Sequence, residues 1–479
     1  MSNLTDLLPA GAGGKQVSFV ASGTIGNGVT VGLNSDGTVT AVVSVAQTIG
    51  SPAVFESANS QWVTSTFDSN SSKVVVAYRD GGNSNYGTAV IGTVSGTSIS
   101  FGTAVVFQSS LIDYTSITFD STLNKVVIAY RNEDNFDYGT AIVGTVSGDS
   151  ISFGTAVVFD AAASEHITSI FDSNSNKVVI AYRNAVGNGD SIVGTVSGTS
   201  ISFGSGVIFA SAQTYEPSIA FDSNSNKVVI AYKDGGNSQK GTAIVGDVSG
   251  TSISYGSEVI FESGRTDAHS VTFDSNSNKV VMSYVDEDNS NYGTSAVGTV
   301  SGTSISFGTP VVFESGTTNN ISATFDSNAN KIVIAYKDIG NSNYGTAVVG
   351  AVSGTSISFN TPIVFENAAV DYPSATYDST NKKVVISYRD IGGSLYGTSI
   401  VFQNASSNNT SFIGISDAAI SDTASGSVTI KGGISTNVTG LTANQNYYVQ
   451  DDGTLSTTAS DVLAGKALSS TSINLDYTT

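Results

Sequence analysis

The sequence is poor in the residues that most often carry chemistry. Its 479 residues include no Cys, two His and one Trp. Without Cys, a disulfide framework and a cysteine-ligated metal site are both excluded. The chain also contains no HExxH, no GxSxG and no phosphate-binding glycine loop, which are the motifs of common hydrolases and nucleotide enzymes. We therefore expect a protein that is not an enzyme and has no cofactor.

Charged residues and long apolar runs are scarce too. Only 12% of residues are charged, and 39 Asp and Glu against 19 Lys and Arg give a net charge of −20. That balance disfavours binding to nucleic acid or to an anionic membrane. The sequence contains no run of about 18 apolar residues, the length that would suggest a membrane span. The first residues, MSNLTDLLPAGAGGKQ, lack the basic start and apolar core of a secretory signal, so we expect synthesis in a cytoplasm.

What the sequence does have is a repeat. FDSNSNKVVIAY stands at 171–182 and again at 221–232. Five looser copies begin at Phe67, Phe119, Phe273, Phe325 and Tyr377. Successive copies start 52 residues apart, except for one step of 50, and a fixed period of this length indicates a repeat architecture.

Each repeat predicts four short strands. In the third copy they are HITSIFDS, KVVIAY, DSIVGTV and SISFGSGVIF, which are rich in β-branched residues and separated by Asp, Asn, Ser and Gly turns. Seven such units predict an all-β fold, a seven-bladed β-propeller with four-stranded blades. A linear β-solenoid is the alternative, although its repeats are usually much shorter.

The two ends of the repeat predict how the ring closes. The Ser-Gly turn before the fourth strand occurs six times, but the ending of that strand occurs seven times, first in GSPAVF at 50–55. The last copy, 370–402, stops after its third strand. A strand at 44–55 should therefore complete the last blade of a propeller spanning 41–402, by strand exchange that leaves no free sheet edge.

The flanks, 1–40 and 403–479, are polar and β-patterned. VTVGLNSDGTVTAV (29–42) and NYYVQDDGTLSTT (446–458) each place an Asp-Gly turn between two strands, a strong hairpin signal. Because ring closure brings residues 43 and 403 to one blade, we expect the flanks to form one small split β-domain into which the propeller is inserted. Two separate tails are the alternative.

FIGISDAAISDTASGSVTIKGGISTNVTGLTANQNYYVQDDGTLSTT (412–458) resembles small β-domains of tailed-phage structural proteins. The repeat units are similar to repeats in virion or tail-associated proteins of marine tailed phages. The resemblance implies a virion surface protein, namely a tail fibre, an adhesin or a capsid decoration protein. It implies other virion proteins and a host-surface glycan or receptor as partners, and a homo-oligomer such as a trimer. It supplies no catalytic residue.

One end of the predicted ring varies between repeats. In each blade-to-blade loop the sixth and seventh residues after the Phe are Gln61-Trp62, Asp113-Tyr114, Glu165-His166, Tyr215-Glu216, Asp267-Ala268, Asn319-Asn320 and Asp371-Tyr372. Aromatic rings stack on the C–H faces of sugars, and carboxylates accept hydrogen bonds from hydroxyls. The predicted glycan-binding residues are Trp62, Asp113, Tyr114, Glu165, His166, Tyr215, Glu216, Asp267, His269, Asp371 and Tyr372. The alternative is that these aromatics only pack the top of the channel.

The loops between second and third strands offer a weak calcium signal. Asp286, Asp288 and Ser290 place oxygens at alternate positions, which suits Ca²⁺. The Gly and Glu of a full calcium loop are absent, so a solvated turn is the stronger interpretation.

Arg79, Arg131, Arg183 and Arg389 share one position after the second strand. A sialidase-like propeller would use several Arg residues to hold a carboxylate, but Lys stands there at 233 and 337, so ion pairing between loops is the simpler explanation. The leading hypothesis is a non-enzymatic virion protein that displays its propeller outward. A glycan-degrading depolymerase and a decoration protein without a ligand are the alternatives.

Overall fold

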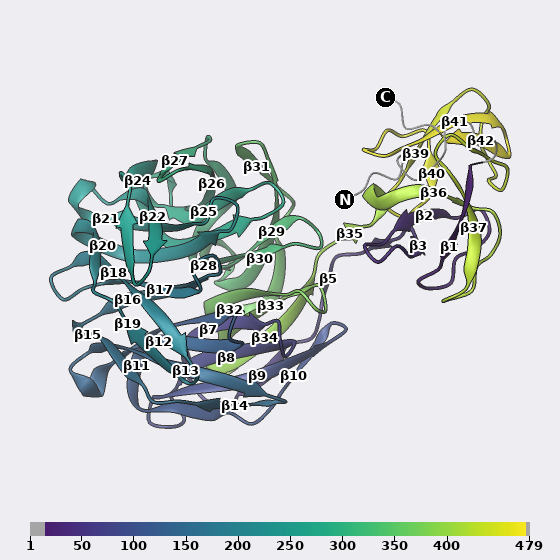
Figure 1. Cartoon of the computed structure of the whole chain (residues 1–479). Helices are drawn as coiled ribbons and strands as arrows, with labels where there is room; N and C mark the ends of the chain where they lie inside the picture. The colour runs from purple at the N-terminus through teal and green to yellow at the C-terminus, as the bar shows by residue number, and fades with distance from the viewer. Residues whose placement is uncertain (1–14, 476–479) are drawn as a thin grey trace. The chain divides into compact units, whose positions relative to one another are not determined.

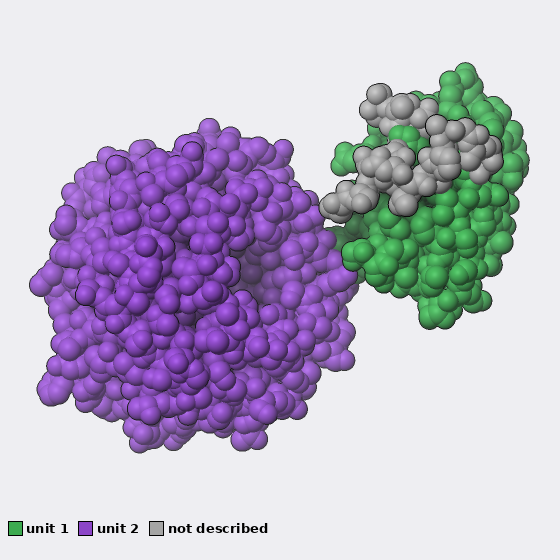
Figure 2. Space-filling view, viewed as in Figure 1, with its two compact units in different colours: residues 1–47, 405–479 green, residues 48–404 purple. Residues whose placement is uncertain are grey.

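The computed structural model describes residues 15–475 and divides the chain into two compact units. Unit 1 comprises residues 1–47 and 405–479, and unit 2 comprises residues 48–404 (Figure 2). The elements of residues 15–475 are β-strands and short 3-10 turns, without an α-helix. The first fourteen residues of the predicted N-terminal flank lie outside the described range. In residues 15–475 we find no helix with the length and hydropathy needed to cross a bilayer.

Unit 2 is an all-β, propeller-like fold built from a repeated antiparallel sheet (Figure 1). The innermost strands lie in β7 (Ser60–Asp68), β11 (Val105–Asp120), β16 (Glu165–Asp172), β20 (Val207–Asp222), β24 (Val259–Asp274), β28 (Val311–Asp326) and β32 (Ile363–Asp378). The second strands are β8 (Lys73–Asp80), β12 (Lys125–Asn132), β17 (Lys177–Arg183), β21 (Lys227–Asp234), β25 (Lys279–Asp286), β29 (Lys331–Asp338) and β33 (Lys383–Asp390).

The third strands are β9 (Tyr86–Ser95), β13 (Tyr138–Ser147), β18 (Asn188–Ser197), β22 (Lys240–Ser249), β26 (Tyr292–Ser301), β30 (Tyr344–Ser353) and β34 (Tyr396–Gln403). Short strands then start the fourth position: β10 (Ser98–Phe101), β14 (Ser150–Phe153), β19 (Ser200–Phe203), β23 (Ser252–Tyr255), β27 (Ser304–Phe307) and β31 (Ser356–Phe359). The outermost, fourth strand of a sheet then continues either in β15 (Val157–Ala163) or in the first half of the next long strand. Between second and third strands lie the 3-10 turns η2 (Glu133–Asn135), η3 (Gly235–Asn237), η4 (Glu287–Asn289) and η5 (Ile339–Asn341).

The hydrophobic core lies between neighbouring sheets. In β12, Val126, Ile128 and Tyr130 pack with residues of β8 and β9, whereas Val127 and Ala129 pack with residues of β17 and β18. Side chains alternate across a strand, so a strand covered on both faces needs apolar residues at every position. This double burial explains the continuous VVIAY runs.

The innermost strands contact one another in chain order, and β32 contacts β7, so the cycle is closed. Serine hydroxyls join neighbouring members: the amide of Val271 donates to Oγ of Ser218 at 3.0 Å, and that of Ala375 to Oγ of Ser322 at 2.9 Å. Between last and first, the Ser65 amide donates to Oγ of Ser374 at 2.9 Å. These bonds satisfy inner-strand donors that no sheet partner reaches.

The N-terminal side of unit 2 supplies the last strand of the last sheet. β34 pairs with β5 (Thr48–Ile49) and with β6 (Ala53–Glu56). Phe55 of β6 packs its ring 5.1 Å from that of Tyr78 and 5.5 Å from that of Phe101. The sequence placed this strand at 44–55, and the observed pairing begins at Thr48 because Ser44 and Val45 pair elsewhere.

Unit 1 mixes strands from both flanks. One sheet has the order β1 (Gln16–Val20), β37 (Ser425–Ile430), β36 (Phe412–Ser416), β2 (Thr30–Leu33) and β3 (Val39–Ala41). The second has the order β38 (Ile434–Ser435), β42 (Ser472–Leu475), β41 (Leu463–Ser469), β39 (Asn446–Val449) and β40 (Leu455–Ser456). A two-strand ladder joins β4 (Ser44–Val45) to β35 (Ser406–Ser407), and η6 (Asn409–Ser411) follows.

Both Asp-Gly hairpins predicted in the flanks are formed, as β2–β3 and β39–β40. Gly37 and Gly453 have φ of 84° and 81°, a region open to Gly without strain. The preceding Asp side chains accept the amides of Thr38 and Thr454, each at 2.9 Å.

Candidate functional site

The innermost strands share a β-bulge at the position where the sequence varies most. In the first sheet the pairing of β7 with β8 shifts register between Gln61 and Thr64, and the other six sheets show an irregularity at the equivalent place. At each bulge one non-glycine residue adopts a left-handed conformation, with φ between 47° and 51°. These residues are Trp62, Tyr114, His166, Glu216, Ala268, Asn320 and Tyr372. For a non-glycine residue this conformation costs about 1–2 kcal/mol.

All seven left-handed residues line one cavity of about 340 Å³. Each innermost strand contributes to its wall, which also includes Thr115, Pro217, His269 and Pro373. Figure 2 shows the surface of unit 2 hollowed near its middle. The bulges therefore direct seven side chains from distant parts of the chain into one space.

Four of these side chains form an aromatic arc, which we define as Tyr372, Trp62, Tyr114 and His166. Neighbouring ring centroids are 5.2, 4.5 and 5.0 Å apart, and the rings are tilted by 42–47°. Trp62 Nε1 also donates to Asp113 Oδ1 at 2.6 Å. Tilted rings cover each other only in part, so the arc packs against itself and still forms one side of the cavity.

The other side of the cavity is polar. Glu216 Oε2 accepts the amide of Ala268 at 2.5 Å, while burial and the charge of Asp267 raise the pKa of Glu216 to about 7. His269 Nε2 lies 2.8 Å from Thr266 Oγ1. Burial lowers the pKa of His269 and of His166 to about 4, so both imidazoles are neutral at pH 7.

Of the sixth-position residues, Asn319 lines the cavity, and the five that were predicted to bind glycan do not. Asp113 bridges Arg79 at 2.5 Å and Arg131 at 3.0 Å, and Glu165 pairs with Arg183 at 2.7 Å. The remaining sixth-position contacts are Lys233 with Asp267 at 3.3 Å, Lys337 with Asp371 at 2.8 Å, Arg389 with Asp371, and Arg183 over the ring of Tyr215 at 4.9 Å. Adjacent residues of a strand point to opposite sides, so these side chains form an ion-pair layer around the cavity wall. This is the register-matched ion pairing favoured by the sequence.

The structure brings together six of the predicted residues in the cavity: Trp62, Tyr114, His166, Glu216, His269 and Tyr372. Asp113, Glu165, Tyr215, Asp267 and Asp371 are absent from its wall. Ala268, Asn319 and Asn320 line it without having been predicted. Their place in the variable pairs of the loops was the available signal.

Two of the three calcium candidates, Asp286 and Asp288, have protein partners. Asp286 accepts the amide of Asn289 at 3.1 Å, and Asp288 pairs with Arg265 at 2.9 Å. Among residues 15–475 no group of three metal-ligating His, Asp or Glu side chains occurs. Calcium binding by Asp286, Asp288 and Ser290 stays an untested prediction.

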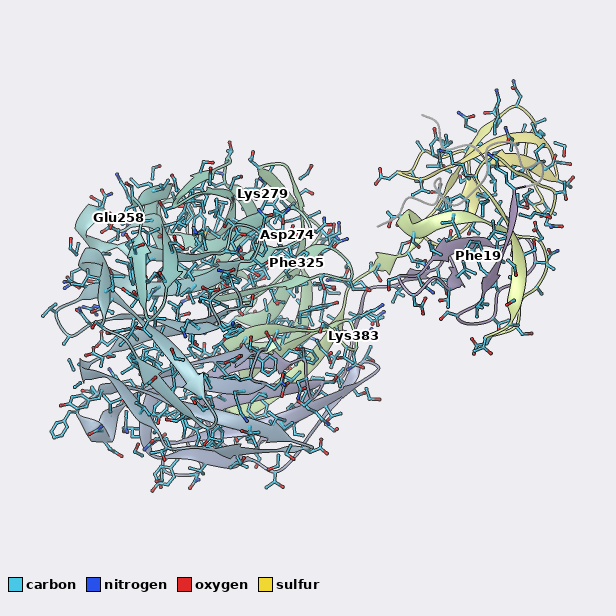
Figure 3. The ribbon with its side chains drawn as sticks, in the orientation of Figure 1. Phe19, Glu258, Asp274, Lys279, Phe325 and Lys383 are labelled. Carbon is cyan, nitrogen blue, oxygen red and sulfur yellow. The ribbon has the colours of Figure 1, made fainter. Side chains whose placement is uncertain are left out.

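The turns between first and second strands are uniform. Asp274 and Lys279, labelled in Figure 3, pair across one of them. Asp274 Oδ1 accepts the amides of Asn276 and Ser277 at 2.9 and 3.0 Å, and Asp222 does the same in its own turn. Each carboxylate is committed to closing its turn, so this end of the sheets offers little variety for recognition.

Replacing Ala268 by Gly should stabilise the protein. Gly removes the cost of the left-handed conformation and keeps the amide that donates to Glu216. We expect a gain of about 0.5–1 kcal/mol in the free energy of unfolding, after the larger unfolded-state entropy of Gly is subtracted. Urea unfolding measures it. Ala323→Gly in β28, the next innermost strand along the chain, has no left-handed backbone to relieve; it is the control and should destabilise.

His166 should make stability depend on pH. Because its folded pKa is lowered from 6.5 to about 4, the unfolded chain binds the proton more readily. The contribution of the neutral imidazole to the free energy of unfolding is fully present above pH 6.5. It is lost as the pH falls from 6.5 through 4, by roughly 3 kcal/mol in total. The unfolding free energy of the parent minus that of His166→Gln should therefore rise from pH 4 to pH 6.5. A flat difference would show that the imidazole is solvated.

No protein-family model and no curated protein matches the chain. Among solved structures, a protein of unknown function from Dyadobacter fermentans is 11% identical, with a TM-score of 0.44, covering 76% of this chain and 99% of that one. A lectin from Burkholderia pseudomallei is 12% identical, with a TM-score of 0.48 and coverages of 71% and 94%. An arginine-to-alanine mutant of AofleA from Arthrobotrys oligospora is 10% identical, with a TM-score of 0.42 and coverages of 66% and 88%. Similarity at this level supports no conclusion about a ligand.

Proposed function

We propose that the chain is a non-enzymatic surface protein of a tailed-phage virion that binds a host-surface glycan or receptor. In this proposal unit 2 is a seven-bladed β-propeller inserted into unit 1. The propeller presents its central cavity to the host, and unit 1, a split β-domain, attaches the protein to other virion proteins or to sister subunits. The left-handed residues at the cavity are the observation that carries the binding role.

The left-handed positions in the turns between first and second strands follow conformational preference, whereas those between second and third strands also include Ser, Phe136, Gln239 and Leu395. At the equivalent point of the turns between first and second strands, Asn stands in five of seven repeats: Asn124, Asn176, Asn226, Asn278 and Asn330. Asn tolerates this conformation better than other non-glycine residues. At the cavity the same conformation is given to Trp, Tyr, His and Glu. The strained conformation is kept at the cavity although the residues there are bulky and vary between repeats. This favours selection of these side chains for the contacts that they make.

The virion assignment is supported by the resemblance of the repeats and of 412–458 to phage structural proteins. The acidic composition, with a net charge of −20, fits an exposed protein that does not bind nucleic acid. A non-enzymatic role agrees with the ion-pair layer, because its Arg and Lys side chains already hold carboxylates of the chain.

Adsorption to host cells tests the proposal. The purified full chain should bind cells of the phage host and release no oligosaccharide from their surface polysaccharide. Release of oligosaccharides would favour a depolymerase, and a chain that adsorbs to no cells would favour a decoration protein without a ligand.

A further inference from the structure

We propose that the cavity takes the uncharged terminal sugar of a glycan, end-on and one per molecule. This rests on the proposed binding role and adds the chemical class, the orientation and the stoichiometry of the ligand. It follows from three features of the cavity: its position, its free polar atoms and the placement of charge around it.

The position predicts one ligand per chain. All seven bulges open into the same cavity, so the varied side chains form one site rather than one site per sheet. A volume of about 340 Å³ lies at the lower end of ligand sites. A narrow site on the axis of a closed cycle admits the end of an oligosaccharide more readily than its middle.

The free polar atoms suit hydroxyl groups. Of the described residues, none hydrogen-bonds the hydroxyls of Tyr114 and Tyr372 or the ring nitrogens of His166, which remain open as donors and acceptors. Asn320 uses its amide nitrogen on Asp371 at 3.2 Å, which leaves its carbonyl oxygen as an acceptor. The rings of the aromatic arc carry the hydroxyls and the imidazole just named, and they also offer apolar surface. Sugars need both kinds of contact.

The charges around the cavity disfavour an ionic ligand. Above pH 7, where Glu216 is mostly ionised, an anion would meet its carboxylate, with Asp267 behind it. A cation would compete with the guanidinium groups of Arg131 and Arg389 for the faces of the aromatic rings. These groups lie 5.0 Å from the ring centres of Tyr114 and Tyr372. The other Arg and Lys side chains of the layer are paired with carboxylates, so an uncharged ligand meets the lowest cost of desolvation.

A glycan microarray separates this inference from the proposed function. The array carries chains that end in neutral hexoses, in sialic or uronic acids, or in free amino sugars. We expect the full chain to bind neutral ends, and calorimetry with the strongest neutral oligosaccharide to give one ligand per chain. Preference for acidic or amino ends, or several ligands per chain, would overturn the inference and leave glycan binding standing. Failure on every glycan would overturn both.

Glu216→Gln tests the charge selection directly. At a pH about 1.5 units above the pKa of Glu216, which is about 7, removing the carboxylate should raise binding to acid-ended glycans, relative to neutral-ended ones, by about tenfold. An unchanged ratio would show that Glu216 does not exclude anions. Asn224→Ala with Asn276→Ala, both on exposed turns at the uniform end of the sheets, is the matched control and should leave the ratio at the parent value.

Discussion

A chain lacking residues 1–56 should aggregate and lose its cooperative melting transition. The deletion removes β5 and β6, which in the described part of the chain pair with the outer edge of β34. It also exposes Phe402 and Val401, which are fully buried in the full chain. An apolar strand edge without a partner is a template for intermolecular pairing, and loss of one sheet's closing strand opens the cycle of innermost strands.

The matched control lacks only residues 1–43. It also loses β1, β2 and β3 of unit 1 but keeps β5 and β6. Differential scanning calorimetry of the two truncations isolates the closing strand, because both damage unit 1. We expect the transition of unit 2 to persist in the shorter deletion. If the longer deletion is soluble and melts like the shorter one, β34 does not depend on this strand.

The largest functional effect is expected from Trp62→Ala combined with Tyr114→Ala. These rings are the centre of the aromatic arc, with centroids 4.5 Å apart. Each aromatic contact contributes about 0.5–1.5 kcal/mol beyond its buried area, so loss of two should weaken adsorption to host cells by roughly 5- to 150-fold. Whole-cell adsorption of the purified variant measures it.

Folding should survive this double substitution. Both side chains lie at the bulges rather than in the buried second strands, and Asp113 keeps Arg79 and Arg131 after it loses the indole. The control pair, Asn224→Ala with Asn276→Ala, should adsorb like the parent. Normal adsorption by the Trp62 and Tyr114 variant, with loss in the control, would place the binding surface at the uniform end of the sheets.

The closing strand could be predicted because two separate features of the sequence indicate it. The repeat ends without a fourth strand at 402, and an unmatched fourth-strand ending stands at 50–55. The observed pairing of Gly397 with Glu56 and of Phe402 with Ile49 agrees with that reading. The start of the strand was placed too early because Ser44 and Val45 have the same polar–apolar alternation as the residues that follow.

The site could be predicted only in part. Residue variation located the end of the repeat where the cavity lies, but sixth and seventh positions were assigned to one surface. A bulge with a left-handed residue separates them, and no residue type in the sequence marks it, because Trp62 or Tyr372 is an improbable choice at such a backbone angle. The split of Asp113 from Tyr114 is therefore a property of the folded backbone. The shared register of the Arg residues gave the one available indication that the carboxylates are paired.

Trp62 allows the most direct test, since it is the only Trp in the chain and lies in the cavity wall. Its fluorescence can be titrated with the strongest neutral oligosaccharide from the array, with acrylamide as quencher. If the cavity is the binding site, the ligand should change the emission of Trp62 with a one-to-one end point and protect it from quenching. Calorimetric binding of the same oligosaccharide without any change in Trp62 emission or quenching would contradict a binding site in this cavity.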